Sequence, residues 1–252
     1  MGIISALRRR ISDDKTSVSA SSWKDACEAA DSYGAEIINK FRLDRSLGRQ
    51  SDGSLLKNSV LGLVMSLLNK ANPLVTDFGG GTGDLGVDLR AVYPLATYTV
   101  VENPTMVELV GNELRGILFS NTIPPVCDIF FSSSTLQYLE DPEYLLKRGI
   151  STAHHAVVLV RNCFSDRVRF GVQKSALFDN GIGPIPPGWQ NRQISYPHRT
   201  LIEKEVISTV ESHGFTCVAN LEEHSGAAMP GTYGRQLVFW RNSNKRASEP
   251  AK

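Results

Sequence analysis

The sequence predicts an α/β fold: a mostly parallel, seven-stranded sheet with one antiparallel edge strand and helices on both faces. Short apolar segments alternate with segments of helical spacing from residue 74 onward, which is typical of a parallel sheet. The last two apolar segments, residues 216–221 and 236–240, have no helix between them, which indicates an antiparallel pair. The first apolar segment leads into a cluster of glycines, as the first strand does in open sheets that bind nucleotide-like ligands.

Helical segments precede this alternation. Residues 11–22 are polar and rich in serine, and we expect residues 1–22 to form a mobile leader. Residues 23–41 and 55–70 have apolar side chains at helical spacing, which predicts a helix over each of them. Together they would form an N-terminal helical segment over residues 23–72.

Five parallel strands are expected before the antiparallel pair, because each is a short apolar run bounded by turn residues. They cover residues 74–78, 97–102, 117–120, 128–132 and 156–160. Helices are expected over residues 84–92, 105–116 and 142–147. Asn103 and Asp141 each precede a proline, and this combination supplies an N-cap and a first-turn residue for the second and third of these helices.

A long segment separates the fifth strand from the last helix. Residues 163–199 are rich in glycine and proline and contain Phe164, Phe170, Phe178, Trp189 and Tyr196. Loops of this length are usually functional, and so many aromatic side chains argue against plain disorder, so we expect a lid. Residues 200–203 have the pattern of a capping box and predict a helix that ends near residue 214. Residues 243–252 are expected to form a disordered tail.

Composition excludes several classes of protein. The 252 residues have a net charge of +1 and no clustered basic face, so we expect no nucleic-acid partner. The four cysteines form no CxxC pair, which argues against a metal site and indicates a reducing compartment. The most apolar stretch, residues 55–68, is too short to span a bilayer. We therefore expect a cytoplasmic protein without stable membrane insertion, and the sequence leaves homo-oligomerisation open.

The glycine-rich turn after the first strand is the main functional signal. It reads Asp77-Phe78-Gly79-Gly80-Gly81-Thr82-Gly83. Glycines let the backbone turn sharply and approach a ligand closely. The residues from Gly81 to Gly86 also match G-x-G-x-x-G, with Glu102 at the distance where dinucleotide-binding sites carry an acid for the ribose. Two ligands therefore fit the turn, a nicotinamide dinucleotide and S-adenosylmethionine.

Two carboxylates favour S-adenosylmethionine. Asp77 precedes the turn and Asp84 begins the following helix, and both would repel a pyrophosphate. The same charges would attract the ammonium and sulfonium groups of S-adenosylmethionine. A nicotinamide-dependent oxidoreductase remains an alternative. So does a non-catalytic subunit that binds S-adenosylmethionine, because no catalytic base is evident.

These motifs resemble those of class I S-adenosylmethionine-dependent methyltransferases. More narrowly, the chain is similar to a methyltransferase family associated with bacterial surface-polysaccharide biosynthesis. The similarity covers residues 23–241 and rests on Trp23, the glycine-rich turn, the strand ending in Glu102, the SSSTLQYL segment at residues 132–139, and the Val172-Gln173 pair.

The resemblance implies a Rossmann-like class I methyltransferase fold over residues 73–242, with residues 163–199 as the acceptor lid. It also implies a methyltransferase that uses S-adenosyl-L-methionine and acts on a small-molecule or glycan acceptor, including a sugar of surface-polysaccharide biosynthesis.

Ten residues would bind the cofactor if the resemblance holds. They are Asp77, Gly79, Gly80, Gly81, Gly83, Glu102, Asn103, Ser132, Ser133 and Gln137. Asp77 and the glycines would hold the methionine end, and Glu102 would accept hydrogen bonds from both ribose hydroxyls, since a carboxylate has two oxygens. Asn103 would lie near the adenine. The two serines and the glutamine would lie beside the sulfonium.

Reacting groups in an open sheet belong at the carboxyl ends of its strands. Asp166 follows the fifth strand and His198 ends the predicted lid. Both are candidate bases for deprotonating an oxygen or nitrogen acceptor. Most of the catalysis would come from alignment and the exclusion of water.

Overall fold

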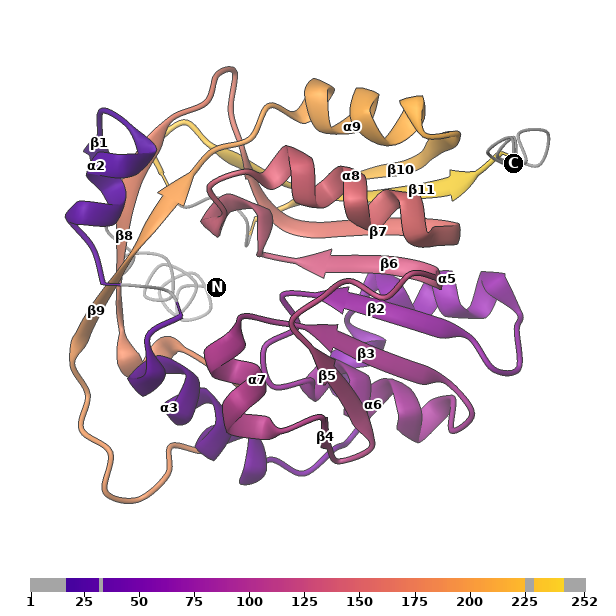
Figure 1. The fold of residues 1–252 in the computed structure, drawn as a ribbon, viewed down its shortest axis with the longest axis horizontal. Helices are drawn as coiled ribbons and strands as arrows, with labels where there is room; N and C mark the ends of the chain where they lie inside the picture. The colour runs from indigo at the N-terminus through magenta and orange to yellow at the C-terminus, as the bar shows by residue number, and fades with distance from the viewer. Residues whose placement is uncertain (1–16, 32–33, 225–228, 243–252) are drawn as a thin grey trace, which may run out of the picture.

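The computed structural model describes residues 17–31, 34–224 and 229–242. Within them, the chain forms a large eight-stranded sheet and a small three-stranded sheet (Figure 1). The large sheet has the order β10 (Phe215–Glu223), β11 (Tyr233–Arg241), β7 (Ala153–Phe164), β6 (Cys127–Ser133), β2 (Leu74–Phe78), β3 (Thr97–Val101), β5 (Ile117–Ser120) and β4 (Glu113–Leu114). The small sheet has the order β1 (Ser17–Ala20), β8 (Phe170–Ala176) and β9 (Gln193–Arg199).

The large sheet has the predicted arrangement. Strands β7, β6, β2, β3 and β5 are parallel neighbours. Strand β11 runs antiparallel to β7, and β10 pairs antiparallel with β11. The two-residue strand β4 extends the sheet beyond β5 and was not predicted. Strand β2 is buried along nearly all of its length, as expected for a central strand covered on both faces.

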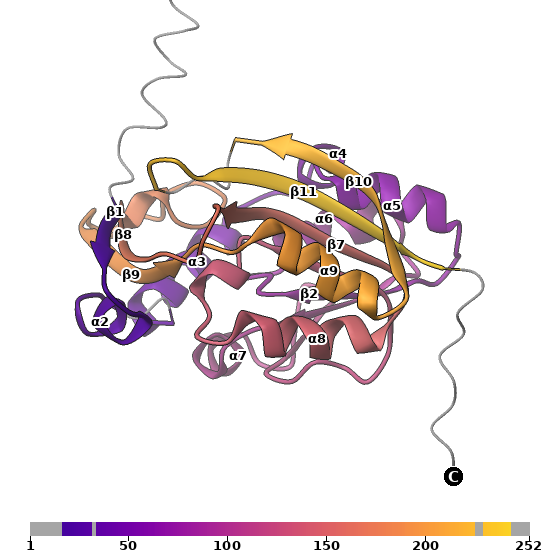
Figure 2. The same ribbon diagram turned by 90° about the horizontal axis from the view of Figure 1, so that it is seen from above.

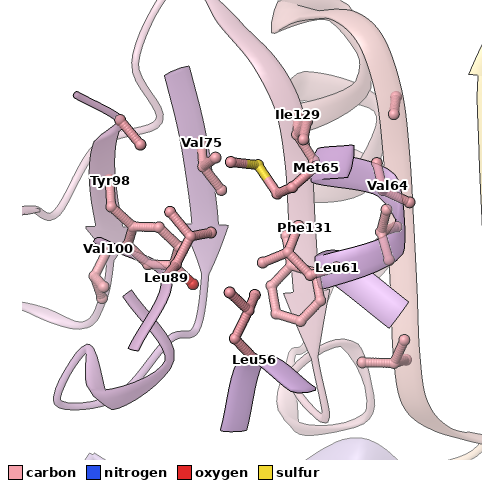
Figure 3. Packing of buried hydrophobic residues seen from close by; sticks show 14 of the residues in the cluster. Leu56, Leu61, Val64, Met65, Val75, Leu89, Tyr98, Val100, Ile129 and Phe131 are labelled. Atoms are coloured by element: carbon pink, nitrogen blue, oxygen red, sulfur yellow. The ribbon is translucent and has the colours of Figure 1, made fainter. Parts of the chain in front are cut away.

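Helices cover both faces of this sheet, and Figure 2 shows α5 and α8 on opposite sides of it. On one face, α4 (Ser54–Lys57), α5 (Val60–Leu68) and α6 (Asp84–Val92) enclose a buried apolar cluster. In Figure 3, Leu56, Leu61 and Met65 lie against Phe131 and Val75 of the strands. On the other face, α8 (Pro142–Thr152) and α9 (Glu203–Ser212) enclose a second cluster. No helix among the described residues is long and apolar enough to cross a membrane.

Two predicted helices are each divided in two. The expected helix over residues 23–41 is α2 (Trp23–Glu28) followed by α3 (Glu36–Leu47), and the expected helix over residues 55–70 is α4 followed by α5. Ser59 separates the second pair: its backbone is extended and its hydroxyl accepts a hydrogen bond from the Leu61 amide at 3.2 Å. A serine oxygen at this position favours a new helix start over continuation of the old helix.

The predicted lid contains regular structure. Its strands β8 and β9 pair antiparallel, and β8 also pairs with β1. Residues 17–20 of the predicted leader are therefore a strand, whereas residues 1–16 and the predicted tail lie outside the described residues. The prediction of a capping box at residues 200–203 is also wrong. Helix α9 begins after Ile202 without a side-chain cap, because the Thr200 hydroxyl bonds Ser165 and the Arg169 amide instead.

Helix α3 joins the small sheet to the large one. The Arg45 guanidinium donates to the carbonyl oxygens of Phe178 and Asn180, at 2.7 and 2.9 Å, in the segment that follows β8. Trp189 in the same segment donates to Asp44 at 2.9 Å. Just beyond α3, Arg49 forms an ion pair with Asp88 of α6, with 2.7 Å between Nη2 and Oδ2. Helix α3 therefore helps to hold the small sheet in place, together with the bonds from Tyr138 to Gln173 and from Arg199 to the Glu140 carbonyl.

Substitution of Gly86 tests the packing of α6 on β3. A Cβ at Gly86 would lie 2.4 Å from the Tyr98 ring, so we expect Gly86→Ala to lower the free energy of unfolding by about 1–3 kcal/mol through overpacking. Alanine otherwise favours a helix by about 1 kcal/mol over glycine. The control is Ala91→Gly at an exposed position of α6, which should cost about 0.5–1 kcal/mol. Urea denaturation measures both variants, and a Gly86→Ala protein more stable than the wild type would contradict this packing.

Candidate functional site

The turn between β2 and α6 is rich in glycine, and its surroundings leave little room for side chains. Gly79 and Gly81 have φ of +77° and +60°, a left-handed conformation that favours glycine. A Cβ at Gly79 would lie 2.1 Å from the Thr135 hydroxyl, and one at Gly80 would lie 2.3 Å from Asp77 Oδ2. A Cβ at Gly81 would meet no atom within 4 Å. The turn is thus packed from behind and open in front, where a ligand can approach.

A cavity of about 440 Å³ lies over this turn. Its floor is the turn itself, together with the carboxyl ends of β2, β3, β6 and β7. Its other walls come from α3 to α5 and from the segment between β8 and β9. The lining includes Arg42, Leu55, Ser59, Asp77, Gly79, Gly80, Gly81, Glu102, Ser133, Tyr138, Arg161, Asn180, Tyr196 and Glu223. Ligand sites are typically concave, with a few polar groups that converge on the ligand.

Asp77 is a buried carboxylate with one oxygen left unmatched. Only 2% of the residue is exposed. The Tyr98 hydroxyl donates to Oδ2 at 2.6 Å, and Oδ1 has no hydrogen-bond partner among the described residues. Burial raises the pKa of Asp77 to about 7; the hydrogen bond from Tyr98 lowers this pKa, and the charge of Glu102 raises it. A buried anion with a vacant acceptor is costly unless a donor or a cation binds beside it.

Glu102 follows β3 and is held beside the turn. The Gly81 amide donates to Oε1 at 3.0 Å. The amide and the side-chain nitrogen of Asn103 both donate to Oε2, at 2.9 and 2.8 Å. Asn103 is also the N-cap of α7 (Pro104–Val110), as predicted, and accepts from the Met106 amide at 3.0 Å. Both carboxylate oxygens are therefore oriented by backbone and side-chain donors.

Asp84 has a different role from the expected one. Its carboxylate accepts from Ser46 at 2.9 Å and from Thr82 at 2.7 Å. Arg115 and Arg49 lie 3.2 and 3.8 Å from Oδ1. Two guanidinium groups thus balance the charge of Asp84, and its bonds connect the start of α6 to Thr82 of the turn and to Ser46 of α3. The charge of Asp84 does not by itself disfavour a pyrophosphate, so the discrimination falls to Asp77.

The residues expected beside the sulfonium separate into two groups. Ser133 lines the cavity, whereas Ser132 and Gln137 do not. Ser132 is fully buried and donates to the Phe78 carbonyl at 3.0 Å. Gln137, in the 3-10 turn Leu136–Tyr138, donates to the Arg161 carbonyl at 3.1 Å. These two side chains connect the ends of neighbouring strands.

Neither candidate base lines the cavity. Asp166 is exposed on the loop after β7. His198 is fully buried in β9, where its ring centroid lies 5.5 Å from that of Tyr138. Tyr138 lines the cavity and His198 does not. The structure therefore does not bring Asp166 and His198 together at the cavity, contrary to expectation.

Two residues beside the cavity carry backbone strain. Ser134, just after β6, and Arg161, within β7, both have φ of +57°, which is costly for residues other than glycine. The Ser134 amide donates to the Val160 carbonyl at 2.9 Å, and the Arg161 amide donates to the Glu223 carboxylate at 2.6 Å. Such strained positions cluster at functional sites, and all four of these residues line the cavity.

One wall of the cavity contains hydrogen bonds that the sequence did not predict. It is a hydrogen-bonded chain that runs from α3 across the small sheet. Its links are Arg42 to Asn180 (3.3 Å), Asn180 to Ser175 (3.2 Å), Ser175 to Tyr196 (3.2 Å), Gln173 to Tyr196 (3.3 Å) and Tyr138 to Gln173 (3.1 Å). Gln173 and Tyr138 belong to the segments that carry the family resemblance, but no motif predicts the bonds between them, because strand pairing across the predicted lid brings these residues together.

Comparison with known proteins identifies the fold. No protein-family model and no curated protein matches the sequence. The 1,6-didemethyltoxoflavin-N1-methyltransferase of Burkholderia thailandensis, solved with 1,6-didemethyltoxoflavin and S-adenosylhomocysteine, is similar over 92% of this chain and 98% of that chain, with a TM-score of 0.53 and 15% identity. An S-adenosylmethionine-dependent methyltransferase from Clostridium acetobutylicum is similar over 77% of this chain and 94% of that chain, with a TM-score of 0.51 and 11% identity. The Rossmann-like fold of class I methyltransferases is thereby confirmed.

The raised pKa of Asp77 predicts how stability depends on pH. An unfolded aspartate titrates near 3.8, and the folded one near 7, so the folded protein holds this proton more tightly. The contribution of Asp77 to stability therefore falls as pH rises from about 4 to about 7. Above pH 7 the ionised carboxylate remains buried, and we expect Asp77→Asn to raise the free energy of unfolding by about 1–4 kcal/mol at pH 8.

The measurement is urea denaturation of the ligand-free wild type and Asp77→Asn at pH 5 and pH 8. The advantage of the variant should be larger at pH 8. A difference that is the same at both values would show that Asp77 is not the titrating group.

Proposed function

We propose that this protein is an S-adenosylmethionine-dependent methyltransferase that acts on a small-molecule acceptor. The observation that carries the proposal is the buried Asp77 carboxylate, with one oxygen unmatched, at the edge of a cavity floored by bare backbone. This arrangement suits a ligand with a positively charged amino group. The class I methyltransferase fold supports the same assignment.

The residues present fit the methyl donor. Asp77 would bind the ammonium group of its methionine part, and the open face of Gly81 would admit that part close to the backbone. Glu102 would accept from the ribose hydroxyls, because its carboxylate is already oriented beside the turn. Bound there, S-adenosylmethionine supplies a methyl group on a sulfonium, which is a good leaving group.

The remaining residues of the cavity would align the acceptor and exclude water, which supplies most of the catalysis in such a displacement. Ser133 and Ser134 lie at the carboxyl end of β6, and Tyr138 follows them. The wall from Arg42 to Tyr138 would bind the polar groups of the acceptor. The Burkholderia thailandensis enzyme, solved with a small molecule, supports an acceptor of that size.

We further propose a sugar or glycan acceptor, in surface-polysaccharide biosynthesis. The family resemblance supports it, and so does a wall rich in amide, hydroxyl and guanidinium groups, because hydroxyl-rich ligands need many donors and acceptors. Cys27, Cys127 and Cys217 form no disulfide, which supports the cytoplasm as the site of action.

Ligand binding separates this proposal from a nicotinamide-dependent oxidoreductase. We expect titration calorimetry to detect binding of S-adenosylhomocysteine and none of NAD. Asp77→Asn and Glu102→Gln should each weaken S-adenosylhomocysteine binding by about 1–3 kcal/mol, through lost charge-assisted hydrogen bonds. Lys40→Ala, at an exposed position of α3, is the control and should bind normally. Tight NAD binding that both site variants abolish would overturn the proposal.

The ionisation of Asp77 should also control affinity. Because the pKa of Asp77 is about 7 in the empty site, the carboxylate is mostly protonated at pH 6 and mostly ionised at pH 8. S-adenosylhomocysteine should therefore bind about tenfold more tightly at pH 8 than at pH 6. Asp77→Asn should remove this dependence, and a variant that keeps it would place the titrating group elsewhere.

Turnover separates a methyltransferase from a non-catalytic binding subunit. With radiolabelled S-adenosylmethionine and a panel of nucleotide sugars and glycans, the wild type should transfer label and the Asp77→Asn variant should transfer much less. A protein that binds the donor and labels no acceptor of any class would be the binding subunit instead.

A further inference from the structure

Asn39 is a buried polar residue near the site that the proposed mechanism does not use. It lies on α3 and is fully buried. Its Nδ2 donates to Asn103 Oδ1 at 3.2 Å and to the Gly34 carbonyl at 3.3 Å. Asn39 does not line the cavity, so any effect it has on a ligand must pass through a neighbour. A buried amide is costly unless it is hydrogen-bonded; here Nδ2 is bonded, its side-chain partner being Asn103, whereas Oδ1 has no hydrogen-bond partner among the described residues.

The bond from Asn39 helps to fix the orientation of the Asn103 amide. Asn103 Oδ1 accepts two hydrogen bonds, one from the Met106 amide at 3.0 Å and one from Asn39. If the Asn103 amide were flipped, its NH₂ group would face these two donors. The unflipped amide directs Nδ2 to Glu102 Oε2, at 2.8 Å.

The chain of contacts therefore ends at the carboxylate assigned to the ribose. Glu102 receives one bond on Oε1 from Gly81 and two on Oε2 from Asn103. One of these three depends on the orientation of the Asn103 side chain. We infer that Asn39 is a positioning residue of the donor site, which acts through Asn103 to hold Glu102 in the orientation that accepts the ribose diol. This inference rests on the proposed function.

The attachments of α3 support this role. Arg45 ties the helix to the segment after β8, and Arg49 just beyond it pairs with Asp88 of α6. Helix α3 also packs on α7, the helix that Asn103 caps. Asn39 is thus presented from a helix that is held at several points, which is what a positioning residue requires.

A double-mutant cycle tests the inference. The dissociation constant of S-adenosylhomocysteine is measured by calorimetry for the full-length wild type, Asn39→Ala, Glu102→Gln and the double variant. We expect Asn39→Ala to raise the dissociation constant about 5- to 10-fold and Glu102→Gln to raise it about 10- to 100-fold. The double variant should bind within about twofold of Glu102→Gln, because Asn39 acts through that carboxylate.

Asn103→Asp provides a second measurement that does not disturb α3. Aspartate keeps the N-cap acceptor for α7 but loses the donor to Glu102, so this variant should also raise the dissociation constant at least about fivefold. It decides the question if Asn39→Ala does not fold. Lys40→Ala is the matched control on the next residue of α3, which is exposed, and should leave the dissociation constant unchanged.

Four results would overturn the inference, and the last of them is distinguishable from the others. If Asn39→Ala binds like the wild type, or if its effect is undiminished in the Glu102→Gln background, Asn39 does not act through Glu102. If Asn103→Asp binds like the wild type, the connection between them is absent. If Glu102→Gln itself binds normally, the assignment of Glu102 in the proposed function fails, and the inference about Asn39 fails with it.

Discussion

The bare backbone between β2 and α6 is the constraint on which the rest of the site depends. Thr135 packs behind Gly79 and the Asp77 carboxylate packs behind Gly80, so neither position has space for a Cβ. In front of Gly81 the space is open. The turn can therefore neither fill with side chains nor collapse onto its neighbours. Asp77 and Glu102 are placed around it by the ends of two adjacent parallel strands, which lie at the same edge of the sheet.

The same arrangement lowers the stability of the ligand-free protein and favours the binding of a cation. Asp77 is ionised at the expense of folding, since burial raises its pKa, and the Tyr98 hydroxyl compensates for only one of its oxygens. A neutral side chain would suit the empty protein better. Retaining a carboxylate there makes sense for a protein that binds a cation, because the ligand then supplies the missing partner. Asp84 shows the contrast, since two arginines balance its charge within the protein.

Helix α3 connects the small sheet to the residues around Glu102. Arg45 and Asp44 attach the segment between β8 and β9 to α3, and Asn39 attaches α3 to the residue after Glu102. The wall assigned to the acceptor and the carboxylate assigned to the donor are therefore connected through one rigid element.

Local signals in the sequence were enough to predict the parallel strands and the glycine turn. Strands 74–78 and 117–120 have the bounds expected of them, and Asn103 and Asp141 cap the expected helices, because apolar runs and cap residues act over a few positions. The remaining features of the fold and the site are determined by the tertiary structure. Strands β8 and β9 pair across a long segment rich in glycine and proline, the charge of Asp84 is balanced by Arg115 from the turn between β4 and β5 and by Arg49, and the burial of His198 in β9 depends on that strand pairing. These features depend on contacts between residues far apart in the chain. Such contacts produce no periodicity or spacing in the sequence from which they could be predicted.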